Sequence, residues 1–238
     1  MTDRCLCPET FSIGDAQFTA SEVIALLGEY VSPERKVRID EVIAERSYTV
    51  VPVMEGLFDR GNVSAVIRSG ESLGFQAMHI IESCEFFKEA KRVTQGADKW
   101  LDVQRWETMV PCIEDLKAKG YRILATHFED ATPLDEVDWT QPSALVFGNE
   151  KDGVTDELLE MADERVTIPM AGFSQSFNIS VAAALCLYHI RNARIAKLGH
   201  HGDLTEVEQE RLRADYYIKS IVAAEQILER KGQDGDRE

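Results

Sequence analysis

The chain has 238 residues, of which 44% are hydrophobic, so it is long enough to bury one sizeable core and to carry extensions. Its 42 acidic and 26 basic residues give a net charge of −16, whereas a dedicated nucleic-acid-binding protein usually has a basic balance. Composition alone therefore argues against a nucleic-acid ligand, and any such ligand would need a local basic face.

Membrane and metal roles are also disfavoured. The apolar run 181–187 is far shorter than the roughly 20 residues of a membrane-spanning helix. The first residues contain neither an apolar signal core nor an Arg/Ser-rich transit pattern, so we expect a soluble, cytoplasmic protein without a membrane partner. Five cysteines, an odd number without a C-x-x-C pair, predict a reduced protein that holds no metal.

Two helices are expected first, at 20–30 and 33–46, the second entered by a capping Ser32 and by Pro33. Strands and helices then alternate: we predict strands at 50–54, 77–81, 121–126, 144–147 and 165–168, and helices at 62–73, 113–119 and 155–162. This alternation predicts an α/β fold, a parallel sheet with helices on both faces. A charged pattern at 205–230 predicts one long final helix.

The chain therefore divides into three expected parts. Residues 1–46 form an N-terminal helical extension, residues 47–196 the α/β domain, and residues 197–238 a C-terminal helical extension.

Three segments could carry chemistry, and the first is the helix that starts near Asn62. Asn62 is placed to cap this helix, and Val63, Val66 and Ile67 form its apolar stripe. Arg68 lies off the stripe. By itself, an arginine in such a place is usually a solvated charge.

The second segment, Gly148-Asn-Glu150-Lys-Asp-Gly153, follows a buried strand. Its two glycines predict a sharp turn at the edge of a parallel sheet, where ligands tend to bind. Val154 stands where a phosphate-binding P-loop needs lysine, which disfavours a nucleotide triphosphatase. No G-x-G-x-x-G follows a strand, which disfavours dinucleotide-binding proteins and Rossmann-type methyltransferases.

The third segment runs from Ile168 through a polar loop into a very apolar helix, which we expect to be buried almost all round. Ser176, Asn178 and Ser180 at its amino end offer donors to a polar or anionic ligand. Taken alone, the segment is more typical of a well-capped core helix.

Together, the three segments are far more specific. Asn-x5-Arg, Gly-Asn-Glu-Lys-x-Gly and Ile-Pro-Met-x-Gly-x-x-x-Ser-x-Asn-x-Ser-x-Ala resemble, in order and spacing, the motifs of the SPOUT superfamily, TrmH-type tRNA/rRNA 2′-O-ribose methyltransferases. The resemblance covers about Pro33 to Arg194, and Ser-Pro-Glu-Arg-x-x-x-Ile resembles the tRNA-modifying members. It implies a trefoil knot in the carboxy-terminal part of the sheet, S-adenosyl-L-methionine (AdoMet) as cofactor, and an active site completed across a homodimer.

The resemblance also assigns individual residues. The implied catalytic residues are Arg68, Asn62, Glu150, Ser176 and Asn178. The implied cofactor contacts, mostly through backbone groups, are Thr126, Gly148, Ile168, Met170 and Phe177. Phe177 replaces a usual leucine and Ile179 a frequent valine, but both stay apolar. No metal is required.

The function implied is a tRNA (guanosine(18)-2′-O)-methyltransferase. One alternative is a ribosomal RNA methyltransferase of the same family, although those usually carry a separate RNA-binding domain, for which residues 1–46 are too few. Another is a knotted RNA-binding protein without activity, favoured by the acidic balance but opposed by the intact motifs. Candidate tRNA contacts on the terminal helices, which could equally be a solvated face with packing tyrosines, are Arg35, Lys36, Arg38, Arg211, Arg213, Tyr216, Tyr217 and Lys219.

Overall fold

The structure, a computed structural model, describes residues 4–56, 59–81, 96–149, 151–174 and 176–235. These residues form two compact units. The sheet unit consists of Arg4 and residues 47–201, and the terminal unit consists of residues 5–46 and 202–235. Residues 5–46 and 202–235, which were expected as parts of two separate extensions, thus cluster in one unit.

The sheet unit is built on a seven-stranded sheet in the order β5-β4-β3-β8-β6-β9-β7, in which every pairing is parallel. Its strands are β3 Val50–Glu55, β4 Ala77–Ile81, β5 Asp102–Trp106, β6 Arg122–Thr126, β7 Thr132–Pro133, β8 Ser143–Phe147 and β9 Glu164–Thr167. Strands β3, β4 and β8 are buried along their whole length, which explains their continuous apolar sequences. The five predicted strands are confirmed, whereas β5 and β7 were not foreseen.

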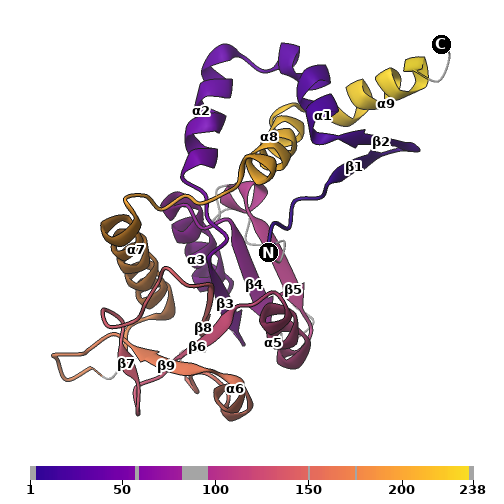
Figure 1. The fold of residues 1–238 in the computed structure, drawn as a ribbon. Helices are drawn as coiled ribbons and strands as arrows, with labels where there is room; N and C mark the ends of the chain where they lie inside the picture. Colours follow the sequence, from indigo (N-terminus) through magenta and orange to yellow (C-terminus); the bar gives the residue numbers. More distant parts are fainter. Residues whose placement is uncertain (1–3, 57–58, 82–95, 150, 175, 236–238) are drawn as a thin grey trace. The chain divides into compact units, whose positions relative to one another are not determined.

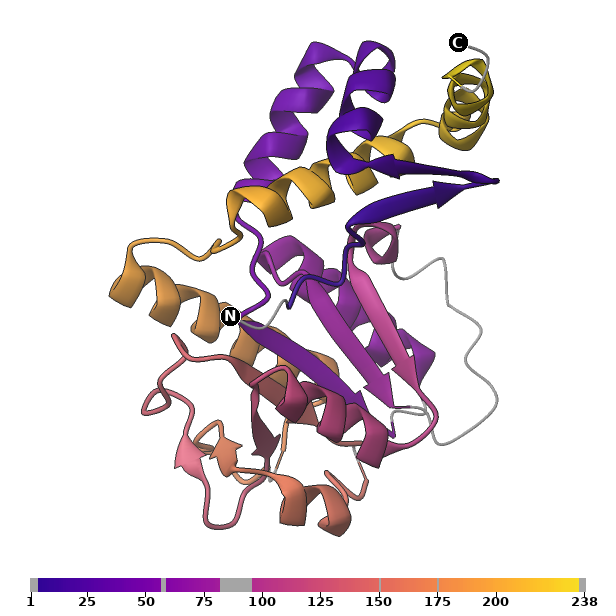
Figure 2. The same cartoon turned by 45° about the vertical axis from the view of Figure 1, so that its right-hand side comes forward.

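Helices cover both faces of this sheet, as predicted. They are α3 Arg60–Leu73, α5 Met109–Ala118, α6 Asp156–Met161 and α7 Ile179–Leu198, with a short 3-10 helix, η2, at Ala97–Trp100. Figures 1 and 2 show α3 and α7 together on one face and α5 on the other. The core between the sheet and α3/α7 includes Val66, Phe147, Leu187 and Ile190.

Helix α3 begins earlier than the sequence suggested. Its cap is Asp59, whose Oδ1 accepts a hydrogen bond from Gly61 N at 2.6 Å. The prediction that Asn62 caps the helix is therefore wrong, because an equally good capping residue precedes it. Asn62 lies in the first turn, where its side chain is available for other contacts.

Helix α7 is not buried all round, and that prediction is wrong for the single chain. Ala183 and Leu187 are fully buried, but Val181, Leu185 and Tyr188 are 45%, 43% and 60% exposed. Spacings of four and three residues put these three side chains on one face of the helix. This face is apolar and uncovered within the described residues.

The terminal unit contains β1 Thr10–Ile13, β2 Ala16–Thr19, α1 Ala20–Leu27, the 3-10 helix η1 Gly28–Tyr30, α2 Pro33–Ala44, α8 Glu206–Ser220 and α9 Ala224–Gly235. Helix α8 packs against α1 and α2. The β1–β2 hairpin was not predicted; it pairs the buried side chains of Phe11 and Phe18. The single long helix predicted for 205–230 is wrong, because Ile221 is extended (φ −110°, ψ 120°) and separates α8 from α9.

Within the described stretches, no helix has the length and apolarity needed to cross a bilayer.

Candidate active site

The carboxyl ends of β3, β8, β6 and β9 lie side by side. In the register of the sheet, Met54 pairs with Phe147, Ala125 with Val146, and Thr126 with Val166. Because all four strands run in the same direction, the segments that follow them emerge at one edge of the sheet. Thr126, Gly148 and Ile168, three of the predicted cofactor contacts, are therefore gathered at this edge, the usual ligand site of an open parallel sheet.

The turn after β8 is closed by backbone contacts. Asn149 and Gly153 exchange two backbone hydrogen bonds of 3.0 Å each. Asn149 Oδ1 accepts further bonds from Lys151 N at 2.9 Å and Asp152 N at 2.7 Å. A Cβ on Gly148 would lie 2.0 Å from the carbonyl carbon of Gly153, so only glycine fits. The predicted catalytic residue Glu150 belongs to this turn but lies outside the described residues.

A buried carboxylate joins this turn to β3. Thr155 N donates to Glu55 Oε2 at 2.9 Å, and Thr155 Oγ1 donates to Glu55 Oε1 at 2.6 Å. Glu55 is only 5% exposed. The sequence analysis missed this residue, although a lone acid that ends an apolar strand was an available signal.

Two predicted catalytic residues contact each other. Asn178 Nδ2 donates to Asn62 Oδ1 at 3.3 Å, which connects the amino ends of α3 and α7. Asn178 is also the cap of α7, because its Oδ1 accepts from Ser180 N at 3.0 Å. The first and third sequence motifs are thus brought together within one chain.

Arg68 and Ser176 are exposed, and the structure does not bring them into this contact. Among the residues that the structure describes, the Arg68 guanidinium has no hydrogen bond or ion pair. Arg68 lies about 9 Å along the α3 axis from Asn62 by ideal helix geometry. Within a single chain, its positive charge is therefore left open to solvent.

The loop between β9 and α7 presents apolar side chains. Ile168 packs against the core, whereas Met170 and Phe177 are 37% and 40% exposed. Phe173, which the sequence analysis did not single out, is fully exposed. The loop that leads into α7 therefore also carries exposed apolar side chains.

The candidate tRNA contacts on α8 are mostly engaged within the terminal unit. Arg211 pairs with Glu9 at 2.6 Å, Arg213 with Asp40 at 2.7 Å, and Lys219 with Asp215 at 2.6 Å. The adjacent tyrosines, Tyr216 and Tyr217, are buried, so they pack in the unit and cannot stack on RNA bases. Of the two alternatives offered for these tyrosines, packing within the protein is therefore confirmed and contact with tRNA is not.

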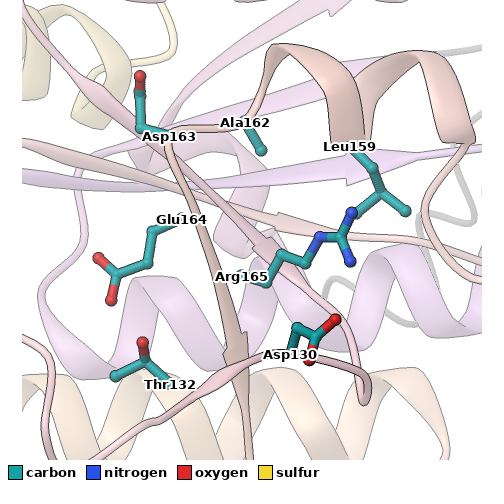
Figure 3. A pocket seen from close by; sticks show the side chains of 7 residues that line it. All are labelled: Asp130, Thr132, Leu159, Ala162, Asp163, Glu164 and Arg165. Atoms are coloured by element: carbon teal, nitrogen blue, oxygen red, sulfur yellow. The ribbon is translucent and has the colours of Figure 1, made fainter.

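A cavity of about 450 Å³ lies elsewhere in the sheet unit (Figure 3). It is lined by Asp130, Thr132, Leu159, Ala162, Asp163, Glu164 and Arg165. No predicted site residue that the structure describes is among them. Three of its seven lining residues are acidic and one is basic, and the cavity contains none of the motif residues, so we do not assign the candidate active site to it.

Comparisons with known proteins agree with this geometry. Residues 49–188 match the model of the SpoU rRNA Methylase family. The tRNA (guanosine(18)-2′-O)-methyltransferase of Escherichia coli K12 is 36% identical over 186 residues, covering 76% of this chain and 81% of the relative.

Solved structures are similar as well. The A. aeolicus TrmH/SpoU tRNA modifying enzyme has a TM-score of 0.72 and 28% identity, covering 79% of this chain and 98% of that one. The SpoU methyltransferase AviRb from Streptomyces viridochromogenes, in complex with the cofactor AdoMet, has a TM-score of 0.59 and 25% identity, covering 66% and 64%. The chain therefore belongs to the SpoU rRNA methylase family.

Proposed function

We propose that the chain is an AdoMet-dependent tRNA 2′-O-ribose methyltransferase that modifies guanosine 18. The observation that carries the proposal is the convergence of the three motif segments, with the 3.3 Å hydrogen bond from Asn178 to Asn62 linking the first to the third. The E. coli relative is named for this reaction, and that name favours an enzyme over an inactive RNA-binding protein.

The residues at the carboxyl edge of the sheet fit AdoMet. The absence of a Cβ at Gly148 lets the backbone of Gly153 pack directly against it, which keeps the turn after β8 tight at this edge. Thr126 ends β6, the strand next to β8, and Ile168 follows β9, the strand next to β6. Met170 and Phe177 supply apolar surface for a nucleoside. When bound, AdoMet supplies an electrophilic methyl group, so the chain must mainly align the ribose oxygen and stabilise its developing charge.

We assign the stabilisation of that developing charge to Arg68. A guanidinium stays protonated in proteins, so it is a poor candidate for a base. It can hold the neighbouring phosphate in a bidentate grip and stabilise the alkoxide that develops on the 2′-oxygen. The phosphate or water then takes the proton.

The remaining assigned residues orient the reactants. In this proposal, Asn178 and Asn62 fix the amino ends of α7 and α3, Ser176 holds the ribose, and Glu150 fixes the cofactor turn. No step needs a metal.

We further propose a homodimer in which Arg68 of one protomer serves the cofactor site of the other. Its support is the uncovered apolar face of Val181, Leu185 and Tyr188 on α7, together with the solvent-exposed guanidinium of Arg68. We also infer that the segment around β9 and α7 is threaded as a trefoil knot. The strand order supports this, since β9 lies between β6 and β7 although it follows both in sequence.

Residues 47–196 form the methyltransferase domain in this proposal, and the extensions 1–46 and 197–238 contribute to tRNA binding in the cytoplasm. The exposed Arg35 and Arg38 of α2 are the best remaining candidates for phosphate contacts. The ion pair of Arg38 with Glu41 spans 3.1 Å, but both side chains are more than half exposed, so RNA can displace it at small cost.

Incubation with methyl-labelled AdoMet and tRNA transcripts tests the function. We expect label on the ribose of guanosine 18 and none on a transcript whose nucleotide 18 lacks its 2′-hydroxyl. Fragments of ribosomal RNA are tested under the same conditions as the alternative substrate. Methylation of those fragments but not of tRNA would contradict the proposal and favour the ribosomal alternative.

A further inference from the structure

We propose that Glu55 is a positioning residue that sets the shape of the AdoMet-binding turn through Thr155. This inference rests on the proposed function. It adds to that function a residue at the end of β3 that lies outside the three motif segments.

The contact spans 100 residues of sequence and two neighbouring strands. Both oxygens of the Glu55 carboxylate accept a hydrogen bond, one from Thr155 N at 2.9 Å and one from Thr155 Oγ1 at 2.6 Å. At 5% exposure, the carboxylate is shielded from water, so these two donors carry much of its stabilisation.

Thr155 is the far end of the turn that starts at Gly148. It caps α6, and its Oγ1 lies 3.4 Å from Leu158 N, from which it accepts a hydrogen bond. The near end is fixed by the two backbone bonds between Asn149 and Gly153. Glu55 therefore holds Thr155, which lies beyond the part of the turn that these backbone bonds close.

The two segments also approach each other at the next residue. Gly56 has a φ of 62°, and a Cβ placed on it would lie 3.8 Å from Asn149 Nδ2. The end of β3 thus lies close to the turn at two places, at Asn149 and at Thr155. A shift of Thr155 away from β3 would also move the backbone of Gly153 that packs against Gly148, one of the predicted cofactor contacts.

The carboxylate is chemically specific in this role. A glutamine at position 55 can accept from Thr155 N through its oxygen and donate to Thr155 Oγ1 through its amide nitrogen. Glu55→Gln therefore keeps the size of the side chain but removes the negative charge, which turns both contacts into weaker neutral hydrogen bonds. Thr155→Val loses the hydroxyl donor while keeping the backbone donor, and Thr155→Ser keeps both.

The test measures the AdoMet dissociation constant by calorimetry, together with kcat and separate KM values for AdoMet and tRNA. We expect Glu55→Gln and Thr155→Val to raise the AdoMet dissociation constant and KM about tenfold, because the first removes the charge from the contact and the second removes one of its hydrogen bonds. The KM for tRNA should stay unchanged, and Thr155→Ser should behave as wild type. The double variant should be no weaker than the worse single variant, because both changes break the same contact.

Tyr48→Phe is the matched control. It removes the hydrogen bond from the buried Tyr48 hydroxyl to Asp102 Oδ2, next to the amino end of β3, and should lower the thermal midpoint without changing AdoMet affinity. Wild-type affinity in both Glu55→Gln and Thr155→Val would overturn the inference, as would an equal loss in Tyr48→Phe. If Glu55→Gln does not fold, the comparison of Thr155→Val with Thr155→Ser decides. A wild-type chain that binds no AdoMet would instead contradict the proposed function itself.

Discussion

Arg68 lies on the exposed side of α3, and its guanidinium is open to solvent. If it stabilises the developing alkoxide, Arg68→Ala should lower kcat by about two to three orders of magnitude, the usual effect of removing one such donor. Arg68→Lys should recover little of this loss, because an ammonium cannot grip phosphate with two parallel bonds. AdoMet affinity, measured by calorimetry, should be unchanged in both variants, and full activity of Arg68→Ala would refute the assigned role.

Asn178 has two separable contacts, one that caps α7 and one that reaches Asn62. Asn178→Ala removes both and should lower the free energy of unfolding by about 1 kcal/mol, the typical effect of losing a cap. Asn178→Asp keeps the capping oxygen but replaces the amide donor to Asn62. We expect Asn178→Asp to unfold like wild type in urea but to methylate tRNA more slowly. Equal activity of Asn178→Asp and wild type would show that the contact with Asn62 is dispensable.

At this scale, the sequence provided candidate site residues but not their contacts. Asn62, Arg68, Gly148 and Asn178 were predicted from the resemblance of three motifs to a known family. The cap of α3 was misplaced, because Asp59 and Asn62 have similar capping preferences and only the folded helix selects between them. Glu55 was missed, because its partner Thr155 lies far away in sequence.

At the scale of secondary structure, β4, β5 and α5 meet in a buried cluster around His79. Trp106 Nε1 donates to His79 Nδ1 at 3.0 Å. Burial, reinforced by the charge of Lys119 and opposed by Asp115, lowers the pKa of His79 from 6.5 to about 4. Between these two pH values the unfolded chain binds more protons than the folded one, so stability falls as the pH falls through this window, by up to roughly 3 kcal/mol.

The check compares urea unfolding at pH 7 and pH 5 for wild type and His79→Gln. Glutamine cannot titrate but can still accept from Trp106, so the variant should lose less stability on acidification than the wild type. An identical loss in both proteins would show that His79 does not titrate as described.

Elements with a strong hydrophobic period were predictable, and weakly patterned ones were not. Strands β3, β4, β6, β8 and β9 were predicted from the sequence, and three of them, β3, β4 and β8, are buried along their whole length. The short β1–β2 hairpin was missed, because it contributes few apolar residues. The split between α8 and α9 was missed because a charged helical pattern continues across Ile221, and only the packing of the terminal unit requires a turn there.

At the scale of the whole molecule, the uncovered apolar face of α7 bears on whether the protein is a monomer or a dimer. If it forms the proposed homodimer interface, Leu185→Glu should shift the protein to monomers by placing charge in a buried contact. Val222→Glu is the control, because Val222 is fully exposed and belongs to the terminal unit. Sedimentation equilibrium should report a dimer for wild type and Val222→Glu. A monomeric wild type, or a dimeric Leu185→Glu, would contradict the interface.

A sequence cannot reveal this surface by periodicity alone. The first half of the helix, 179–188, is apolar on nearly all sides, and the sequence analysis therefore expected it inside one core. The fold of a single chain covers only the side that contains Ala183 and Leu187.

Subunit complementation tests the central claim most directly, namely that Arg68 acts at a cofactor site built around Gly148. One protein carries Arg68→Ala, the other Gly148→Ala, whose added Cβ would meet Gly153 at 2.0 Å. Each alone should be inactive towards tRNA. After the two are unfolded and refolded together, half of the dimers pair one of each, and each pair holds one intact site, so activity should return to about a quarter of wild type. Mixed dimers that form but remain inactive would contradict a site shared between protomers.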